Sequence, residues 1–191
     1  MNRETIQKVI EQAIFTLQKG GVILYPADTI WGIGCNAADQ QAVQQVYTIK
    51  GRAYNKPLIV LVSDLDQLYD VVKNVHPRVD TLLHFHERPL TIIYPGAKEA
   101  YSHLAGPDGT IGVRIVTSGF CHELLVAYGK PLVSTSANVS GEVTPVKFGN
   151  ISSAIISAVD LALPAFTERD LTGRPSVIAK YDENGELDFL R

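Results

Sequence analysis

The spacing of apolar residues divides this 191-residue chain into alternating helices and strands. Between residues 6 and 17 they recur every three or four positions, as on one face of an α-helix, and Gly20-Gly21 ends the pattern. A second helix is expected over 39–49, with Asp39 as its N-cap. A further helix is predicted to start at Ser63, with Asp66 completing a variant capping box, and the chain continues helically over 79–87. The last two predicted helices span 119–129 and 151–159.

Short runs rich in β-branched residues predict buried strands between these helices. They are VILYP (22–26), LIVLV (58–62), LTIIYP (90–95), TIGVRIV (110–116) and PLVSTS (131–136). A Gly/Pro-rich loop is expected over 96–109, and residues 176–190 are predicted to form a hairpin around Asn184-Gly185. Because helices and strands alternate, with β-rich pairs among them, we expect a single α/β domain over residues 1–191 on a mixed parallel and antiparallel sheet.

Composition indicates a folded protein without a membrane span. Hydrophobic residues make up 46% of the chain and charged residues 19%, which is enough apolar content for a core. No apolar run approaches the roughly 18 residues of a transmembrane helix, and charges interrupt the first turns, so we expect no signal peptide. Cys35 and Cys121 lie far apart and are expected to be reduced core thiols of a cytoplasmic protein.

Common nucleotide-binding motifs do not account for the glycines of this chain. GIGCNA (32–37) matches the dinucleotide pattern G-x-G-x-x-A, but the predicted helix starts too late, at Asp39, and no acid follows about 20 residues later. We therefore interpret these glycines as residues that let a strand pack closely. The chain contains neither the P-loop pattern G-x-x-x-x-G-K-[ST] nor the nucleophile elbow G-x-S-x-G.

Two polar loops indicate a local site for an anion. KGRAYNKPL (50–58) carries Lys50, Arg52 and Lys56 without an acid, although the net charge of the chain is -3. A net-acidic protein does not coat nucleic acid by bulk charge, so the negative partner is expected to bind locally. The second loop, STSANVSG (134–141), is either a turn that caps the preceding strand or a set of neutral donors for phosphate oxygens.

An arginine interrupts the apolar strand TIGVRIV. Side chains alternate between the two faces of a strand, so Arg114 is expected to face away from the core, on the same side as Thr110 and Gly112. An arginine in the middle of a strand usually has a planar anionic partner such as a carboxylate. The partner is either a ligand or, in the alternative interpretation, an acidic side chain in a structural ion pair.

Six ordered segments of the chain resemble the marker segments of a known family. They are YPADTIWGIGC, KGRAYNKPLIVLV, RPLTIIYP, TIGVRIV, PLVSTSANVSG and GRPSVIAKYD. In this order they resemble the YrdC-type threonylcarbamoyl-AMP synthases, from about Gly20 to the C-terminus. The resemblance implies a twisted α/β sheet around a concave basic groove. It also implies an enzyme that condenses L-threonine, bicarbonate and ATP into threonylcarbamoyl-AMP and pyrophosphate, for N6-threonylcarbamoylation of adenosine 37 in tRNA.

The resemblance also implies roles for individual residues. The expected ATP-binding residues are Lys50, Arg52, Lys56, Thr110, Ser136, Asn138, Thr144, Ser176 and Arg191. The expected threonine-binding residues are Thr29, Arg114 and Ser134. Lys50 and Arg52 would stabilise charge in the transition state, Mg²⁺ is expected on the phosphates, and no protein nucleophile is required. The expected partners are the tRNA-threonylcarbamoyl transferase machinery, and tRNA or double-stranded RNA.

Several residues depart from the usual pattern of this family and leave other functions open. They are Ala27, Trp31, Leu61, Arg88 and Val177, in positions where the family commonly has threonine, tyrosine, histidine, glycine and threonine. These departures bear on amino-acid selectivity more than on ATP binding. The alternatives are an RNA-binding protein of the same fold without synthase activity, and a different adenylate-forming or phosphate-handling enzyme.

Overall fold

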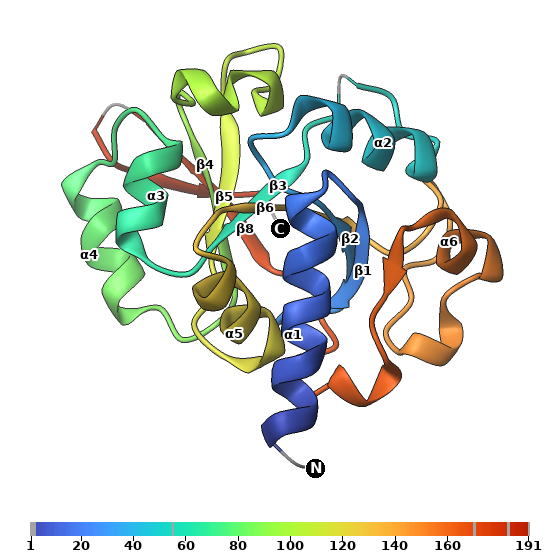
Figure 1. The fold of residues 1–191 in the computed structure, drawn as a ribbon. Coiled ribbons are helices and arrows are strands. Elements are labelled where there is room, and N and C mark those ends of the chain that lie inside the picture. The colour runs from blue at the N-terminus through green and yellow to red at the C-terminus, as the bar shows by residue number, and fades with distance from the viewer. Residues whose placement is uncertain (1–2, 55, 170, 183, 191) are drawn as a thin grey trace.

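A computed structural model describes residues 3–54, 56–169, 171–182 and 184–190 (Figure 1). One twisted sheet of nine strands, in the order β7-β1-β2-β6-β3-β5-β4-β8-β9, forms the centre of the molecule. The strands are β1 (Ile23–Pro26), β2 (Trp31–Gly34), β3 (Ile59–Val62), β4 (Leu90–Tyr94), β5 (Ile111–Ile115), β6 (Leu132–Ser136), β7 (Leu161–Ala162), β8 (Val177–Tyr181) and β9 (Leu187–Phe189). The predicted α/β fold is therefore confirmed.

Parallel and antiparallel neighbours are mixed within this sheet, as the sequence predicts. β3 is parallel to β5 and β4 is parallel to β8, whereas β1–β2, β2–β6, β3–β6 and β4–β5 are antiparallel pairs. β8 and β9 form the predicted hairpin, with Gly185 at a positive φ of 76° in its turn. In β2 a Cβ at Gly34 would lie 2.0 Å from the Val133 carbonyl oxygen, so glycine is needed for close packing there.

Helices cover both faces of the sheet. They are α1 (Arg3–Gln18), α2 (Gln40–Lys50), α3 (Leu65–Val71), α4 (Pro77–Phe85), α5 (Gly119–Tyr128) and α6 (Ser153–Ala158), with 3-10 turns at Glu99–Leu104, Phe148–Asn150 and Ala165–Thr167. Figure 1 shows α1 and α5 together in front of the sheet. These two helices pack on one core cluster with Leu61, while α2, α3 and α4 pack on a second with Val60 and Val62. The alternation along β3 places the two clusters on opposite faces.

The N-cap predicted for α2 is confirmed, and the one predicted for α3 is corrected. Asp39 caps α2 as predicted, because its side chain accepts hydrogen bonds from the backbone N–H groups of Gln41 and Ala42. The capping box predicted from Ser63 and Asp66 is wrong. Asp64 is the N-cap of α3 and accepts from Gln67 N at 2.8 Å, while Gln67 Oε1 accepts from Ser63 N at 3.1 Å. A carboxylate is a stronger acceptor than a hydroxyl, which favours the cap one residue later.

Three smaller features complete the comparison with the sequence. The helical stretch predicted after Ser63 is two helices, because α4 begins separately at Pro77 with His76 as its N-cap. Cys35 and Cys121 are free and buried, as expected, and burial raises the pKa of both thiols. Within the described ranges, no helix has the length and apolar content needed to cross a membrane.

Candidate active site

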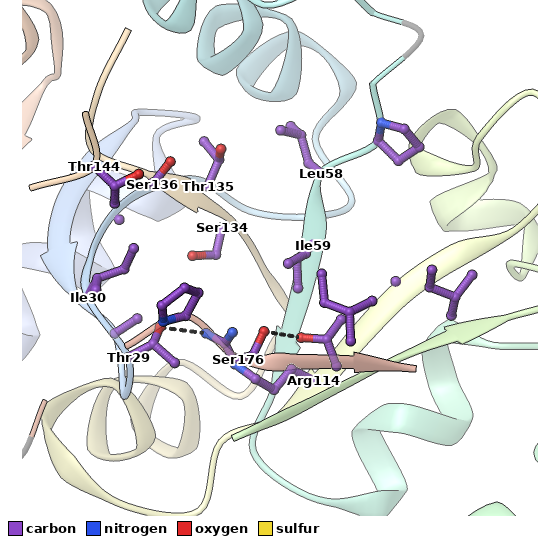
Figure 2. A pocket seen from close by; sticks show the side chains of 18 of the residues that line it. Thr29, Ile30, Leu58, Ile59, Arg114, Ser134, Thr135, Ser136, Thr144 and Ser176 are labelled. Atoms are coloured by element: carbon purple, nitrogen blue, oxygen red, sulfur yellow. Dashed lines mark hydrogen bonds between the residues drawn. The ribbon is translucent and has the colours of Figure 1, made fainter. Parts of the chain in front are cut away.

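A cavity of about 410 Å³ opens on the sheet face that also carries α1 and α5 (Figure 2). Its floor comes from β3, β5 and β6, and its walls come from the turn after β1 and from residues 175–178. Arg52 and Arg114 are the charged side chains among the described residues that line it. Polar contacts inside the cavity come mainly from hydroxyls, namely Thr29, Thr91, Thr110, Ser134, Thr135, Ser136, Thr144 and Ser176. Two cations without a lining acid favour anionic ligands.

Most of the residues expected from the sequence to bind substrates meet in this one cavity. Of twelve such residues, eight line it: Thr29, Arg52, Thr110, Arg114, Ser134, Ser136, Thr144 and Ser176. In the view of Figure 2, Thr29 and Arg114 lie on one side, Ser136 and Thr144 on the other, and Ser134 between them. Lys50, Lys56 and Asn138 are outside the lining, and Arg191 lies outside the described residues.

Arg114 is the buried cation at one side of the cavity. Only 5% of its side chain is exposed, and its neighbours Ile111 and Val113 face the opposite core cluster, as the alternation predicts. Arg114 Nη2 lies 2.9 Å from Asp28 Oδ1 and donates a hydrogen bond to Thr29 Oγ1 at 3.4 Å. The ion pair considered from the sequence is therefore present. Arg114 Nε, however, is buried without a hydrogen-bond partner among the described residues.

Ser134 and Gly32 shape the middle of the cavity. Ser134 is buried on β6, and a Cβ at Gly32 would lie only 3.0 Å from Ser134 Oγ. A side chain at residue 32 would therefore press on the hydroxyl, so the glycine keeps Ser134 accessible to the cavity. Behind it, burial raises the pKa of Tyr25 well above its ordinary value, and this phenol donates to the Val133 carbonyl at 3.4 Å.

Arg52 and Thr110 lie on loops at the mouth of the cavity. The guanidinium of Arg52 donates to the backbone carbonyls of Lys56 at 3.1 Å and Pro57 at 3.0 Å, which closes the cation-rich loop on itself. The Thr110 hydroxyl donates to Asp108 Oδ1 at 2.7 Å. Its proton is then committed, so this hydroxyl can only accept a further hydrogen bond from a ligand. The hydrogen bonds from the Thr110 hydroxyl and backbone N–H lower the pKa of Asp108.

Lys50 binds the polar loop after β6 and not the cavity. Its side chain is 1% exposed, and Nζ lies 2.5 Å from both the Ser136 and the Asn138 carbonyl oxygens. Burial, and secondarily the charge of Arg52, lower the pKa of Lys50 to about 8, so the ammonium remains protonated at neutral pH. Three N–H donors facing protein oxygens leave little for a direct contact with phosphate. This geometry differs from the direct phosphate contact expected from the sequence.

Asn138 and Lys56 also serve their own loops. Asn138 Oδ1 lies 3.2 Å from Lys50 Nζ, and its Nδ2 donates to the carbonyls of Val139 and Glu142. This amide therefore fixes the turn after β6. Lys56 is exposed, and its carbonyl accepts from Tyr47 Oη at 3.2 Å. The two residues belong to the loops of the site without lining the cavity.

A strap, residues 171–176, closes one wall. Thr172 N donates to the Asp28 carbonyl at 3.1 Å and Gly173 N to the Thr29 carbonyl at 2.9 Å. At its end, Ser176 Oγ lies 2.9 Å from Thr91 Oγ1, and Thr91 pairs with Arg114 across β4 and β5. Sequence reasoning missed Thr91, although a lone hydroxyl in the apolar strand LTIIY was a usable signal.

Three of the residues that depart from the usual family pattern lie in the cavity lining or in the core. Ala27 and Trp31 line the cavity, whereas Leu61 is fully buried in the cluster with α1 and α5.

Among the described residues no group of three or more His, Cys, Asp or Glu could hold a metal ion. The lining supplies hydroxyl oxygens but no carboxylate, which does not fit a resident Mg²⁺ site.

This fold and cavity define an α/β protein with one polar cavity, in which the charged side chains among the described lining residues are two arginines. The chain belongs to the Sua5/YciO/YrdC family, because residues 16–191 match its family model, described as "Telomere recombination". The threonylcarbamoyl-AMP synthase of Pseudoalteromonas translucida is 35% identical over 150 residues, which cover 77% of this chain and 80% of the relative. That of Stenotrophomonas maltophilia is 36% identical over 141 residues, covering 70% and 73%. The predicted family is therefore confirmed.

Solved structures share the fold. E. coli YciO superposes with a TM-score of 0.82 at 25% identity, covering 97% of this chain and 89% of YciO. P. abyssi Sua5 complexed with L-threonine gives a TM-score of 0.81 at 23% identity, covering 95% of this chain and 53% of Sua5. At such identity the Sua5 likeness is one of fold alone.

Proposed function

We propose that this protein is a threonylcarbamoyl-AMP synthase, which condenses L-threonine, bicarbonate and ATP into threonylcarbamoyl-AMP and pyrophosphate. The observation that carries the proposal is one cavity in which a buried arginine, Arg114, and a hydroxyl-rich side with Ser136 and Thr144 face the same space. Relatives named threonylcarbamoyl-AMP synthase at 35–36% identity support the same activity.

The reaction needs positioning more than covalent help from the protein. The amine of threonine takes up bicarbonate with loss of water, or carbon dioxide directly, to form a carbamate. A carbamate oxygen then attacks the α-phosphorus of ATP, and the bond to pyrophosphate breaks with its electron pair on the leaving oxygen. Because the carbamate is the nucleophile, the cavity has only to hold two anions in line and stabilise the developing charge.

The side of the cavity at Arg114 would bind threonine. The guanidinium is held by Asp28 and Thr29, and its buried Nε still has a donor to offer. A substrate carboxylate is the ligand that would satisfy this donor, since an unpaired buried donor is costly. Ser134 would face the amine or the carbamate, from the middle of the cavity.

The opposite side would bind ATP. Arg52 would contact the phosphates, Ser136 and Thr144 would donate to phosphate oxygens, and Ser176 would approach from the strap. Thr110, whose proton is committed to Asp108, would accept from an N–H or O–H of the nucleoside. Lys50 and Asn138 would act indirectly, because they fix the loop that carries Ser136. Lys56 would contact the phosphates from outside the lining. Arg191, which is not among the described residues, would close over them.

Magnesium would enter with the nucleotide. Mg²⁺ keeps several waters and is commonly bound through substrate phosphates. With hydroxyls but no carboxylate among the described lining residues, the cavity would hold the ion through the phosphates of ATP. The product, an activated acyl-adenylate, would be consumed by a tRNA-modifying transferase that moves the threonylcarbamoyl group to adenosine 37.

Pyrophosphate release tests this function. We expect release from ATP only when L-threonine and bicarbonate are both present, and a product with the mass of threonylcarbamoyl-AMP. Equal release with serine, alanine or no amino acid would show a different adenylate-forming reaction. Binding of double-stranded RNA without pyrophosphate release would favour an RNA-binding protein of the same fold.

A further inference from the structure

One carboxylate oxygen outside the cavity connects three segments of the chain. Glu168 Oε2 accepts a hydrogen bond from Trp31 Nε1 at 2.6 Å and another from Phe148 N at 2.6 Å. The rings of Trp31 and Phe148 pack on each other with 5.0 Å between centroids. Glu168 is half-buried and does not line the cavity. Any effect of Glu168 on the reaction must therefore act through the residues that it holds.

Each of the three segments supplies a different wall of the cavity. Trp31 follows Thr29 and Ile30 at the start of β2, and Phe148 lies shortly after Thr144. Glu168 precedes the strap, which ends at Ser176. The strap and the 143–148 segment also lie close together, because a Cβ built at Gly173 would be 3.4 Å from Val146 Cγ1. The Glu168 oxygen is the point where the three walls are joined by hydrogen bonds.

The position of Thr144 depends on this junction. Residues 143–146 make no hydrogen bond to another described residue. On its N-terminal side the Glu142 carbonyl accepts from Asn138 Nδ2 at 2.7 Å. On its C-terminal side Phe148 N donates to Glu168, and the Lys147 carbonyl accepts only from Asn150 N of the same local turn. Hydrogen bonds to an ionised carboxylate are shorter and stronger than those between neutral groups. Without Glu168 the segment would lose the hydrogen bond that ties its C-terminal end to another part of the chain, and would keep only the packing of the buried Pro145 and of the Phe148 ring. The buried indole N–H would also lose its acceptor.

We propose that Glu168 is a positioning residue for the nucleotide: it holds Thr144 against the cavity through Phe148 N and ties this wall to β2 through Trp31. Removing the carboxylate loosens the 143–148 segment and weakens ATP binding. Threonine binding changes less, because Thr29 is also held by Arg114 and by the strap. This inference rests on the proposed function for its kinetic readout, but the exchange of backbone amides is independent of activity.

Glu168→Ala tests the proposal, with Glu123→Ala as its control. Glu123 is an exposed carboxylate on α5, away from the cavity lining. We expect Glu168→Ala to raise the KM for ATP about tenfold and the KM for threonine less than twofold, as loss of a buried hydrogen-bond acceptor allows. Hydrogen–deuterium exchange should become faster over 143–148 in this variant and stay unchanged in Glu123→Ala. In a Thr144→Val background, Glu168→Ala should add little to the KM for ATP.

Glu168→Gln keeps the test available if the alanine variant does not fold. Its amide oxygen still accepts, but without charge, so the KM for ATP should rise about two- to threefold. Unchanged exchange over 143–148 in the folded variants would overturn the proposal. So would faster exchange with a wild-type KM for ATP, because the contact would then be structural only. If the wild-type protein lacks threonine-dependent pyrophosphate release, the proposed function fails, and calorimetric ATP binding replaces KM in the same comparison.

Discussion

Arg114 and Asp28 form an ion pair inside the protein, with Nη2 and Oδ1 2.9 Å apart and at most 10% of either side chain exposed. The pair leaves Arg114 Nε without a partner among the described residues. Burying a charge is tolerated when it is paired, and removing one partner of a buried pair is strongly destabilising. Asp28 therefore stabilises the arginine in the folded protein.

We expect Arg114→Lys to weaken threonine binding and to leave ATP binding nearly unchanged. Lysine retains a charge for Asp28 but lacks the planar fork that contacts a carboxylate and Thr29 together. The loss for threonine should be about 1.5–3 kcal/mol, the range for hydrogen bonds to charged groups. Separate calorimetric titrations with threonine and ATP measure it, and Arg78→Lys, at an exposed position of α4 outside the cavity lining, is the control.

The reverse pattern would contradict this assignment. If Arg114→Lys weakens ATP and leaves threonine unchanged, the arginine belongs to the phosphate side of the cavity. If neither affinity changes in a folded variant, the ion pair with Asp28 is its whole role, as the alternative interpretation of the sequence holds.

Arg52→Ala should nearly abolish turnover in a protein that still folds. The guanidinium lies at the cavity mouth, and its hydrogen bonds to described residues go to two carbonyls of its own loop, so we expect the core not to depend on it. Loss of one charge-assisted contact to a transition-state phosphate should cost roughly 3 kcal/mol, about a hundredfold in rate. Turnover and thermal unfolding are measured together, with Arg78→Ala on α4 as the control. A destabilised variant whose folded fraction is fully active would make this loop structural.

The sequence predicts the fold well because periodic patterns dominate long elements. The spacing in 6–17 and 39–49 defines α1 and α2, and β-branched runs define β3, β4 and β5. The strand β7 has only two residues and carries no periodic signal, so the sequence does not predict it. Ser63 and Asp64 are adjacent and could each cap α3. Residue spacing alone does not determine which of the two accepts the hydrogen bond at the start of the helix.

The sequence predicts which residues lie at the candidate site, but it does not predict which atoms they contact. The polar loops and the mid-strand arginine lead to most of the cavity lining. The orientation of Lys50 depends on carbonyls of residues 136 and 138, which the fold brings to it from another strand. Asp28, Thr91 and Glu168 were missed for the same reason, since each acts through a partner distant in sequence.

RNA binding, where present, should be weak and electrostatic. The net charge of the chain is -3, and the cations of the site are confined to the loop at 50–56 and to the cavity. Affinity for a duplex should therefore fall steeply as salt rises and should not depend on duplex sequence. A filter-binding series between low and physiological salt measures both properties. Salt-resistant, sequence-selective binding would contradict this expectation and favour a dedicated RNA-binding role.

The last prediction concerns the buried ammonium of Lys50. Replacing it by methionine keeps the length of the side chain but leaves the carbonyls of Ser136 and Asn138 without their donor. We expect Lys50→Met to lower the free energy of unfolding at pH 7 by about 1–3 kcal/mol, the cost of leaving buried polar groups unsatisfied. ATP binding should weaken as well, because the loop that carries Ser136 is released. Urea unfolding and calorimetry measure the two effects.

The pH dependence of the same comparison has a defined sign. The pKa of Lys50 is lowered from 10.5 to about 8, so between these values the unfolded chain binds more protons at this residue than the folded protein. The free energy of unfolding of the wild type, relative to Lys50→Met, should therefore rise with pH from about 8 to 10.5. Other titrating groups are common to both proteins and cancel in the difference. A constant difference over this range would show that the pKa of Lys50 is not lowered in the folded protein.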